Sequence, residues 1–98
     1  MRKIVFVDID DTLVRSAGSK RIPIPSVVSR VRALKAEGAE VFLWSTGGAD
    51  YCKATAGELG LADCIAGCLP KPTVYIDDQP VGDWRDCRHV YPMNADSA

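Results

Sequence analysis

The chain has 98 residues, a formal net charge of −1, 47% hydrophobic residues and 26% charged residues. This length suits a single small domain over residues 1–98 that is built around one hydrophobic core. The nearly balanced charge provides no basic surface for nucleic acid or for an anionic membrane. We therefore expect neither of these partners.

The N-terminus leads directly into an apolar run, without a separate secretion signal, and no apolar run approaches membrane-spanning length. We therefore expect a cytoplasmic protein, and the sequence specifies no oligomeric state. Because the cytoplasm is reducing, the cysteines are expected to be free thiols. They are Cys52, Cys64, Cys68 and Cys87.

The first predicted strand ends in a cluster of carboxylates. The apolar residues 4–7 run into Asp8-Ile9-Asp10-Asp11-Thr12. A continuous apolar run is typical of a buried parallel strand, and open α/β sheets bind ligands beyond the carboxyl ends of their strands. Neighbouring carboxylates repel one another unless a cation or a proton compensates, so the cluster indicates a metal site. The alternative is a solvated turn in which Asp10, Asp11 or Thr12 caps a helix.

A loop or short hairpin and then a helix are predicted after this cluster. Residues 13–25 are rich in polar residues, Gly and Pro, which is typical of a loop over a strand end. Ser26 is a candidate N-cap for a helix over residues 27–37, and Gly38 is its expected stop. Apolar residues recur at helical spacing along that helix. They are Val27, Val28, Val31 and Leu34.

Residues 40–44 form a second apolar run of the buried-strand type, followed at once by Ser45-Thr46-Gly47-Gly48. A helix is predicted over residues 49–59, and a short third strand is predicted over residues 64–69. The alternation of strands and helices predicts an α/β fold with a mainly parallel sheet.

A second acidic strand end is predicted near the C-terminus. Residues 73–76 are β-branched and aromatic, as suits a fourth strand, and Asp77 and Asp78 follow. If this strand lies parallel to the first, its acids and Asp8 meet at one edge of the sheet and form an oxygen-lined site of the kind that Mg²⁺ prefers. Residues 89–91 are a candidate edge strand before a frayed end.

Taken together, these motifs resemble those of the haloacid dehalogenase (HAD) superfamily of aspartate-nucleophile phosphotransferases. Asp8-Ile9-Asp10-Asp11-Thr12 matches the first motif of that family, with Asp11 at a position where many members have glycine. Ser45 after its strand matches the second motif, Lys71 the third, and Asp77-Asp78 the fourth. The resemblance covers nearly the whole chain and implies a Rossmann-like three-layer sandwich with a HAD-like sheet.

The resemblance also implies a mechanism. Asp8 would be the nucleophile that forms an aspartyl-phosphate, and Asp10 would be the general acid and base. Mg²⁺ would be held by the Asp8 carboxylate, the Asp10 backbone carbonyl and an acid of the Asp77-Asp78 pair, with Asp77 favoured as the direct ligand. The chain is thus expected to be a Mg²⁺-dependent phosphatase, with an unidentified phosphorylated substrate.

Two further residues would complete the phosphate site. Ser45, with Thr46 beside it, would hydrogen-bond a phosphoryl oxygen, and Lys71 would contribute a positive charge. The alternatives are that Ser45 or Thr46 only caps the following helix, and that Lys71 is an ordinary solvated lysine, in which case Lys53 is the substitute.

The chain has no insertion large enough for a cap domain, so we expect an open site. Substrate recognition would then fall to a basic loop that contains Arg15, Lys20 and Arg21, although such a loop can also be merely solvated. Trp44 and Tyr51 are candidates for stacking on a substrate, and packing is the alternative role.

Two alternatives to an enzyme are a HAD-like binding protein and a receiver-like phosphoacceptor. Receiver domains also use a strand-end aspartate, Mg²⁺, a hydroxyl and a lysine. Their paired acids follow the first strand, however, whereas here the Asp77-Asp78 pair comes last. This order favours the phosphatase.

Overall fold

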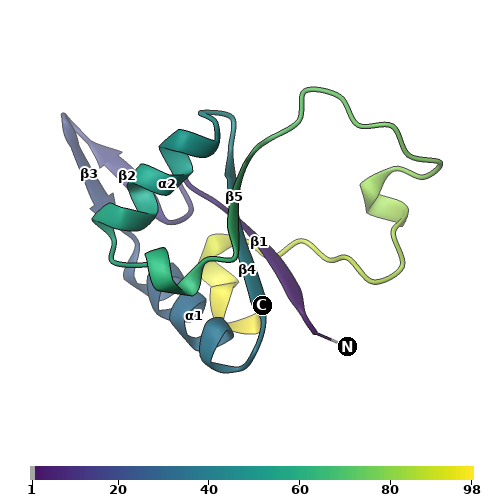
Figure 1. The fold of residues 1–98 in the computed structure, drawn as a ribbon, viewed down its shortest axis with the longest axis horizontal. Helices are drawn as coiled ribbons and strands as arrows, with labels where there is room; N and C mark the ends of the chain where they lie inside the picture. Colours follow the sequence, from purple (N-terminus) through teal and green to yellow (C-terminus); the bar gives the residue numbers. More distant parts are fainter. Residues whose placement is uncertain (1) are drawn as a thin grey trace.

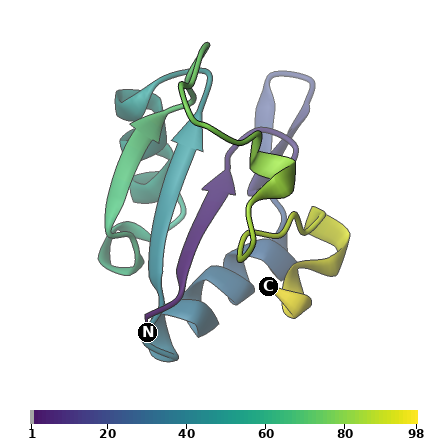
Figure 2. The ribbon, with the colours of Figure 1, turned by 90° about the vertical axis from the view of Figure 1, so that its right-hand side faces the viewer.

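The structure, a computed structural model, describes residues 2–98. A sheet of parallel strands lies at its centre, in the order β1-β4-β5. The register pairs Asp8 with Trp44 and Trp44 with Leu69, so the strands end at the same edge (Figure 2). A small parallel α/β domain is therefore confirmed. The strands are β1 (Ile4–Asp8), β4 (Glu40–Ser45) and β5 (Gly67–Pro70).

The segment predicted as a loop or short hairpin is a hairpin. Strands β2 (Val14–Ala17) and β3 (Lys20–Pro23) pair in antiparallel register. Gly18 lies between them with a φ of 63°, a left-handed conformation that glycine adopts without steric cost. Leu13 and Val14 at the base of the hairpin are buried, which anchors it to the core.

Helix α1 (Pro25–Ala36) begins slightly earlier than predicted. Its N-cap is Ile24, without a side-chain cap, so the prediction of Ser26 as N-cap is wrong. Pro25 explains the shift, because its fixed φ suits the first helical position and its missing N–H needs no partner there. The predicted stop is confirmed, since Gly38 follows the helix with a φ of 91°.

Helices α1 and α2 (Ala49–Glu58) both cover one face of the sheet (Figure 1). Val41 and Leu43 of β4 point into this layer and are fully buried. The other face carries an aromatic cluster in which the Phe6 ring lies 5.2 Å from Phe42 and 5.0 Å from Trp44, measured between centroids. Residues 2–98 thus place helices α1 and α2 in one layer, and they do not form the second helical layer of the expected three-layer sandwich.

The predicted fourth strand over residues 73–76 is not formed. Residues 72–89 are exposed throughout and leave the sheet as a long loop that contains only a short 3-10 turn, η2 (Val81–Asp83) (Figure 1). Ile76 is 99% exposed. A strand needs a hydrogen-bonded neighbour and a buried face, and this segment has neither in the structure. The high strand propensity of residues 73–76 was therefore not sufficient to predict a strand.

The C-terminal residues also differ from the prediction. Residues 89–91 form no strand, and the end is not frayed, because the 3-10 segment η3 (Pro92–Ser97) packs against α1 and buries Ala95. Strand β5 begins later than predicted, after the short 3-10 turn η1 (Ala62–Cys64). Within residues 2–98, no helix has the length and apolar character needed to cross a membrane.

Candidate functional site

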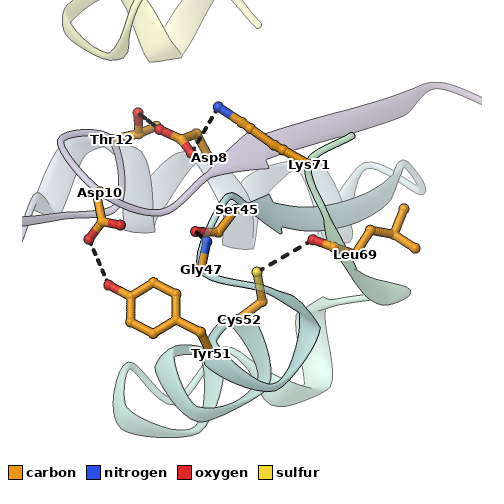
Figure 3. Close-up of polar contacts among 9 residues, drawn as sticks. All are labelled: Asp8, Asp10, Thr12, Ser45, Gly47, Tyr51, Cys52, Leu69 and Lys71. Atoms are coloured by element: carbon orange, nitrogen blue, oxygen red, sulfur yellow. Dashed lines mark hydrogen bonds and ion pairs between the residues drawn. The ribbon is translucent and has the colours of Figure 1, made fainter. Parts of the chain in front are cut away.

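Three of the predicted motifs meet at the carboxyl edge of the sheet. Lys71 follows β5, and its Nζ lies 3.2 Å from Oδ1 of Asp8 at the end of β1 (Figure 3). The Lys71 backbone N–H also donates to the carbonyl of Ser45 at 2.9 Å. Because the strands run parallel in matched register, residues that are distant in sequence come together at this edge. Lys71 is thus paired with a carboxylate rather than freely solvated.

The turn after β1 holds the Asp8 side chain from its other side. The Thr12 hydroxyl donates to Oδ2 of Asp8 at 3.3 Å. The Ile9 carbonyl accepts backbone N–H groups of the turn, including that of Leu13 at 2.9 Å. Asp11 has a φ of 61°, which is the left-handed region and explains why glycine suits this position in the resembled family. Asp11 therefore contributes to this turn through its left-handed backbone conformation.

Ser45 lies beneath the turn that joins β4 to α2. It is 1% exposed, and its Oγ accepts the backbone N–H of Gly47 at 3.0 Å. Thr46 is exposed at the same edge. Gly48 is the N-cap of α2 and no side chain caps that helix, so the capping role considered for Ser45 or Thr46 is wrong. The N-terminus of α2, which favours anions, thus lies at the edge that carries Asp8 and Lys71, with Thr46 exposed beside it and the Ser45 hydroxyl buried below.

Asp10 is held by a residue of α2. The Tyr51 hydroxyl donates to Oδ1 of Asp10 at 2.6 Å, and the Arg21 guanidinium lies over the Tyr51 ring, 5.0 Å from its centroid. The hydrogen bond to Asp10 raises the pKa of Tyr51, burial adds to the effect, and the charge of Arg21 opposes it. Tyr51 was considered only for stacking or packing. The only signal for a polar role was its position near the start of the helix that follows Ser45.

The basic residues of the hairpin have different surroundings. Arg15 and Lys20 are exposed. Arg21 instead contacts α2, where it forms a 2.8 Å ion pair with Glu58 and a 2.8 Å hydrogen bond to the hydroxyl of Thr55. The hairpin is thereby fastened to the helix that carries Tyr51.

Trp44 packs in the aromatic cluster rather than standing free. Its ring lies edge-on to Phe6, and the Nζ of Lys71 lies 5.6 Å from its centroid. Such a cation–π contact restrains the lysine beside Asp8. Lys53, considered as the substitute for Lys71, is exposed on α2. The lysine that the family resemblance indicated is thus also the one paired with Asp8.

The Asp77-Asp78 pair lies in the exposed segment rather than at a strand end. Oδ1 of Asp77 accepts the backbone N–H of Gln79 at 2.9 Å, the geometry of a local turn. Within residues 2–98, no group of three or more His, Cys, Asp or Glu side chains is gathered closely enough to hold a metal ion. The oxygen donors of Asp8 and Asp10 have the chemistry that Mg²⁺ prefers, but the predicted set is not assembled in this arrangement.

No family model, curated protein or solved structure matches this chain. The resemblance to the HAD superfamily therefore depends on the sequence motifs alone.

Proposed function

We propose that the protein is a phosphoric monoester hydrolase of the HAD type, with a Rossmann-like domain and no cap, in which Asp8 is the nucleophile. The observation that carries this proposal is the convergence of Asp8, Lys71 and Ser45 at one edge of the sheet. A carboxylate beside an ammonium group, a hydroxyl and a helix N-terminus suits attack on a group that is itself surrounded by negative charge.

The reaction would proceed in two steps. An oxygen of the Asp8 carboxylate attacks phosphorus, the bond from phosphorus to the ester oxygen breaks, and Asp10 gives its proton to the departing alkoxide. Asp10 then takes a proton from a water molecule that attacks the aspartyl-phosphate. The bond between phosphorus and Asp8 breaks, inorganic phosphate leaves, and both carboxyl groups return to their starting states.

Lys71 would have two tasks in this reaction. Its ammonium group neutralises charge on the phosphoryl oxygens, and its contact with Asp8 fixes the orientation of the nucleophile. Thr46, with Ser45 below it, would supply hydrogen bonds to the same oxygens. Arg15 and Lys20 stand exposed on the hairpin, where they would meet an anionic substrate.

We propose Mg²⁺ as the cofactor, and its ligands would be the Asp8 carboxylate, the Asp10 carbonyl and an acid of the Asp77-Asp78 pair. Such an ion neutralises phosphoryl charge. The structure does not gather this set, so the proposal requires the exposed segment to move. Asp77 lies six positions after Lys71, a reach of roughly 20 Å, which allows the segment to fold back toward Asp8.

The direct test is hydrolysis of p-nitrophenyl phosphate with Mg²⁺ by the wild-type protein and by Asp8→Asn and Asp10→Asn. We expect metal-dependent turnover that both substitutions abolish: Asp8→Asn removes the nucleophile, and Asp10→Asn removes the base that activates water to release phosphate from Asp8. Asp63→Asn, an exposed carboxylate on η1, is the matched control and should retain full activity. Undiminished activity in Asp8→Asn would exclude Asp8 as the nucleophile. Stoichiometric phosphorylation without turnover would instead favour a phosphoacceptor module.

A further inference from the structure

Tyr51 makes the shortest hydrogen bond among the candidate site residues, at 2.6 Å to Oδ1 of Asp10 (Figure 3). Both partners are partly or fully exposed, at a place where a hydrogen bond contributes little to folding. The contact joins the start of α2 to the turn after β1, two elements that otherwise position separate motifs. Its place suggests a role in the reaction rather than in stability.

The surroundings of Tyr51 hold the ring in this position. A Cβ atom at Gly47 would lie 2.8 Å from Cδ2 of Tyr51, so only glycine leaves room for the ring here. Arg21 restricts the Tyr51 ring as well, because its guanidinium lies over the ring. That guanidinium is itself held by Glu58 and Thr55. The ring is thus confined between the turn after β4 and the hairpin.

We propose that Tyr51 is a positioning residue for Asp10, and this inference rests on the proposed phosphatase function. The Tyr51 hydroxyl occupies Oδ1 of Asp10, which fixes the side-chain rotamer and leaves Oδ2 as the oxygen that carries the transferable proton. A general acid acts only within hydrogen-bond reach of the leaving oxygen, so a fixed rotamer matters in the step where Asp10 gives up its proton.

Leaving-group chemistry separates this role from a structural one. An ester with a poor leaving group, such as glycerol phosphate, needs a proton from Asp10 as the phosphorus–oxygen bond breaks. The p-nitrophenolate of p-nitrophenyl phosphate leaves readily without one. Because kcat/KM reports only the steps up to the aspartyl-phosphate, where Asp10 acts as the acid, loss of Asp10 positioning should lower it far more for the alkyl ester than for the aryl ester. A general disturbance of the site should lower it equally for both.

The experiment compares kcat/KM for these two esters in wild type, Tyr51→Phe and Gly47→Ala. Tyr51→Phe removes the hydroxyl and keeps the ring under Arg21. Gly47→Ala displaces the ring and also presses on the Ser45 hydroxyl, which would lie 3.3 Å from the added Cβ, so it represents a broader disturbance of the site. We expect Tyr51→Phe to lose about 10–100-fold on glycerol phosphate and no more than about threefold on p-nitrophenyl phosphate, and Gly47→Ala to slow both esters. Tyr75→Phe in the exposed segment is the matched control, and circular dichroism verifies folding.

The two failures are distinguishable. If wild type hydrolyses both esters but Tyr51→Phe reduces them by the same factor, or reduces neither, the positioning role is overturned and the phosphatase is not. If wild type hydrolyses neither ester, the proposed function is overturned, and the role of Tyr51 with it.

Discussion

Strand β1 and the exposed residues 72–89 contain similar sequences with different outcomes. Each has β-branched and aromatic residues followed by adjacent carboxylates, yet β1 is paired along β4 and the residues before Asp77 are unpaired and exposed. Val7 is nearly buried against the helical layer, whereas Ile76 is 99% exposed. The difference teaches that strand-forming residues require a neighbouring strand and a covering layer before they form a strand.

The same difference divides the candidate site. Asp8 is fixed by Lys71 and Thr12, because the paired strands bring their ends together. Asp77 contacts only its own turn, through the N–H of Gln79. One half of the predicted site is therefore assembled by the sheet, and the other half depends on movement of the exposed segment.

The largest effect is expected at the assembled half. Lys71→Ala removes the charge that faces Asp8, and kcat/KM should fall about 10²–10³-fold, as for other fixed groups that stabilise transition-state charge. The measurement is hydrolysis of p-nitrophenyl phosphate at saturating Mg²⁺. Lys53→Ala serves as the control and should change kcat/KM little. A greater loss of kcat/KM in Lys53→Ala than in Lys71→Ala would mean that Lys53 neutralises the phosphoryl charge.

Stability should distinguish the two regions next. Leu43→Ala leaves a cavity in the fully buried core and should lower the free energy of unfolding by about 2–5 kcal/mol. Ile76→Ala removes a side chain that is 99% exposed and should change it by less than about 0.5 kcal/mol. Urea unfolding followed by circular dichroism measures both. A large loss in Ile76→Ala would mean that the segment packs against the domain in solution.

A smaller effect is expected from the acids of the exposed segment. If Asp77 folds back to hold Mg²⁺, Asp77→Asn should raise the Mg²⁺ concentration for half-maximal activity about tenfold or more. Removal of Mg²⁺ with a chelator should abolish activity, and added Mg²⁺ should restore it. Asp86→Asn in the same segment is the matched control. An unchanged Mg²⁺ requirement in Asp77→Asn would show that this acid stays away from Asp8.

The smallest effect is expected from thiol labelling, which compares the accessibility of two cysteines in the folded protein. Cys87 is exposed in the segment, whereas Cys52 is buried in α2 and its burial raises the pKa of its thiol. Because the thiolate is the reactive form, a thiol-specific reagent near neutral pH should label Cys87 rapidly and Cys52 only on unfolding. Cys87→Ser should remove the fast phase. Rapid labelling of Cys52 in the folded protein would contradict the described core.

The residues before Asp8 and Ser45 were sufficient to predict two parallel strands from their continuous apolar runs. The expected burial of the first strand is found on one face only, because Phe6 on the other face is 43% exposed. The family resemblance also indicated Lys71, which the structure finds beside Asp8. The contact between Tyr51 and Asp10 could not be predicted, since it depends on how α2 packs and on the room left at Gly47. Local propensity likewise could not show that residues 73–76 lack a pairing partner.

The central claim is that Asp8 becomes phosphorylated during turnover, and chemical trapping tests it most directly. Borohydride reduces an acyl phosphate to an alcohol, so quenching the protein during hydrolysis of p-nitrophenyl phosphate should convert Asp8 to homoserine. Peptide mass spectrometry locates the change. The proposed mechanism predicts homoserine at position 8 in the presence of substrate and an unmodified Asp8 in its absence. Phosphate release with trapping at another carboxylate would contradict it.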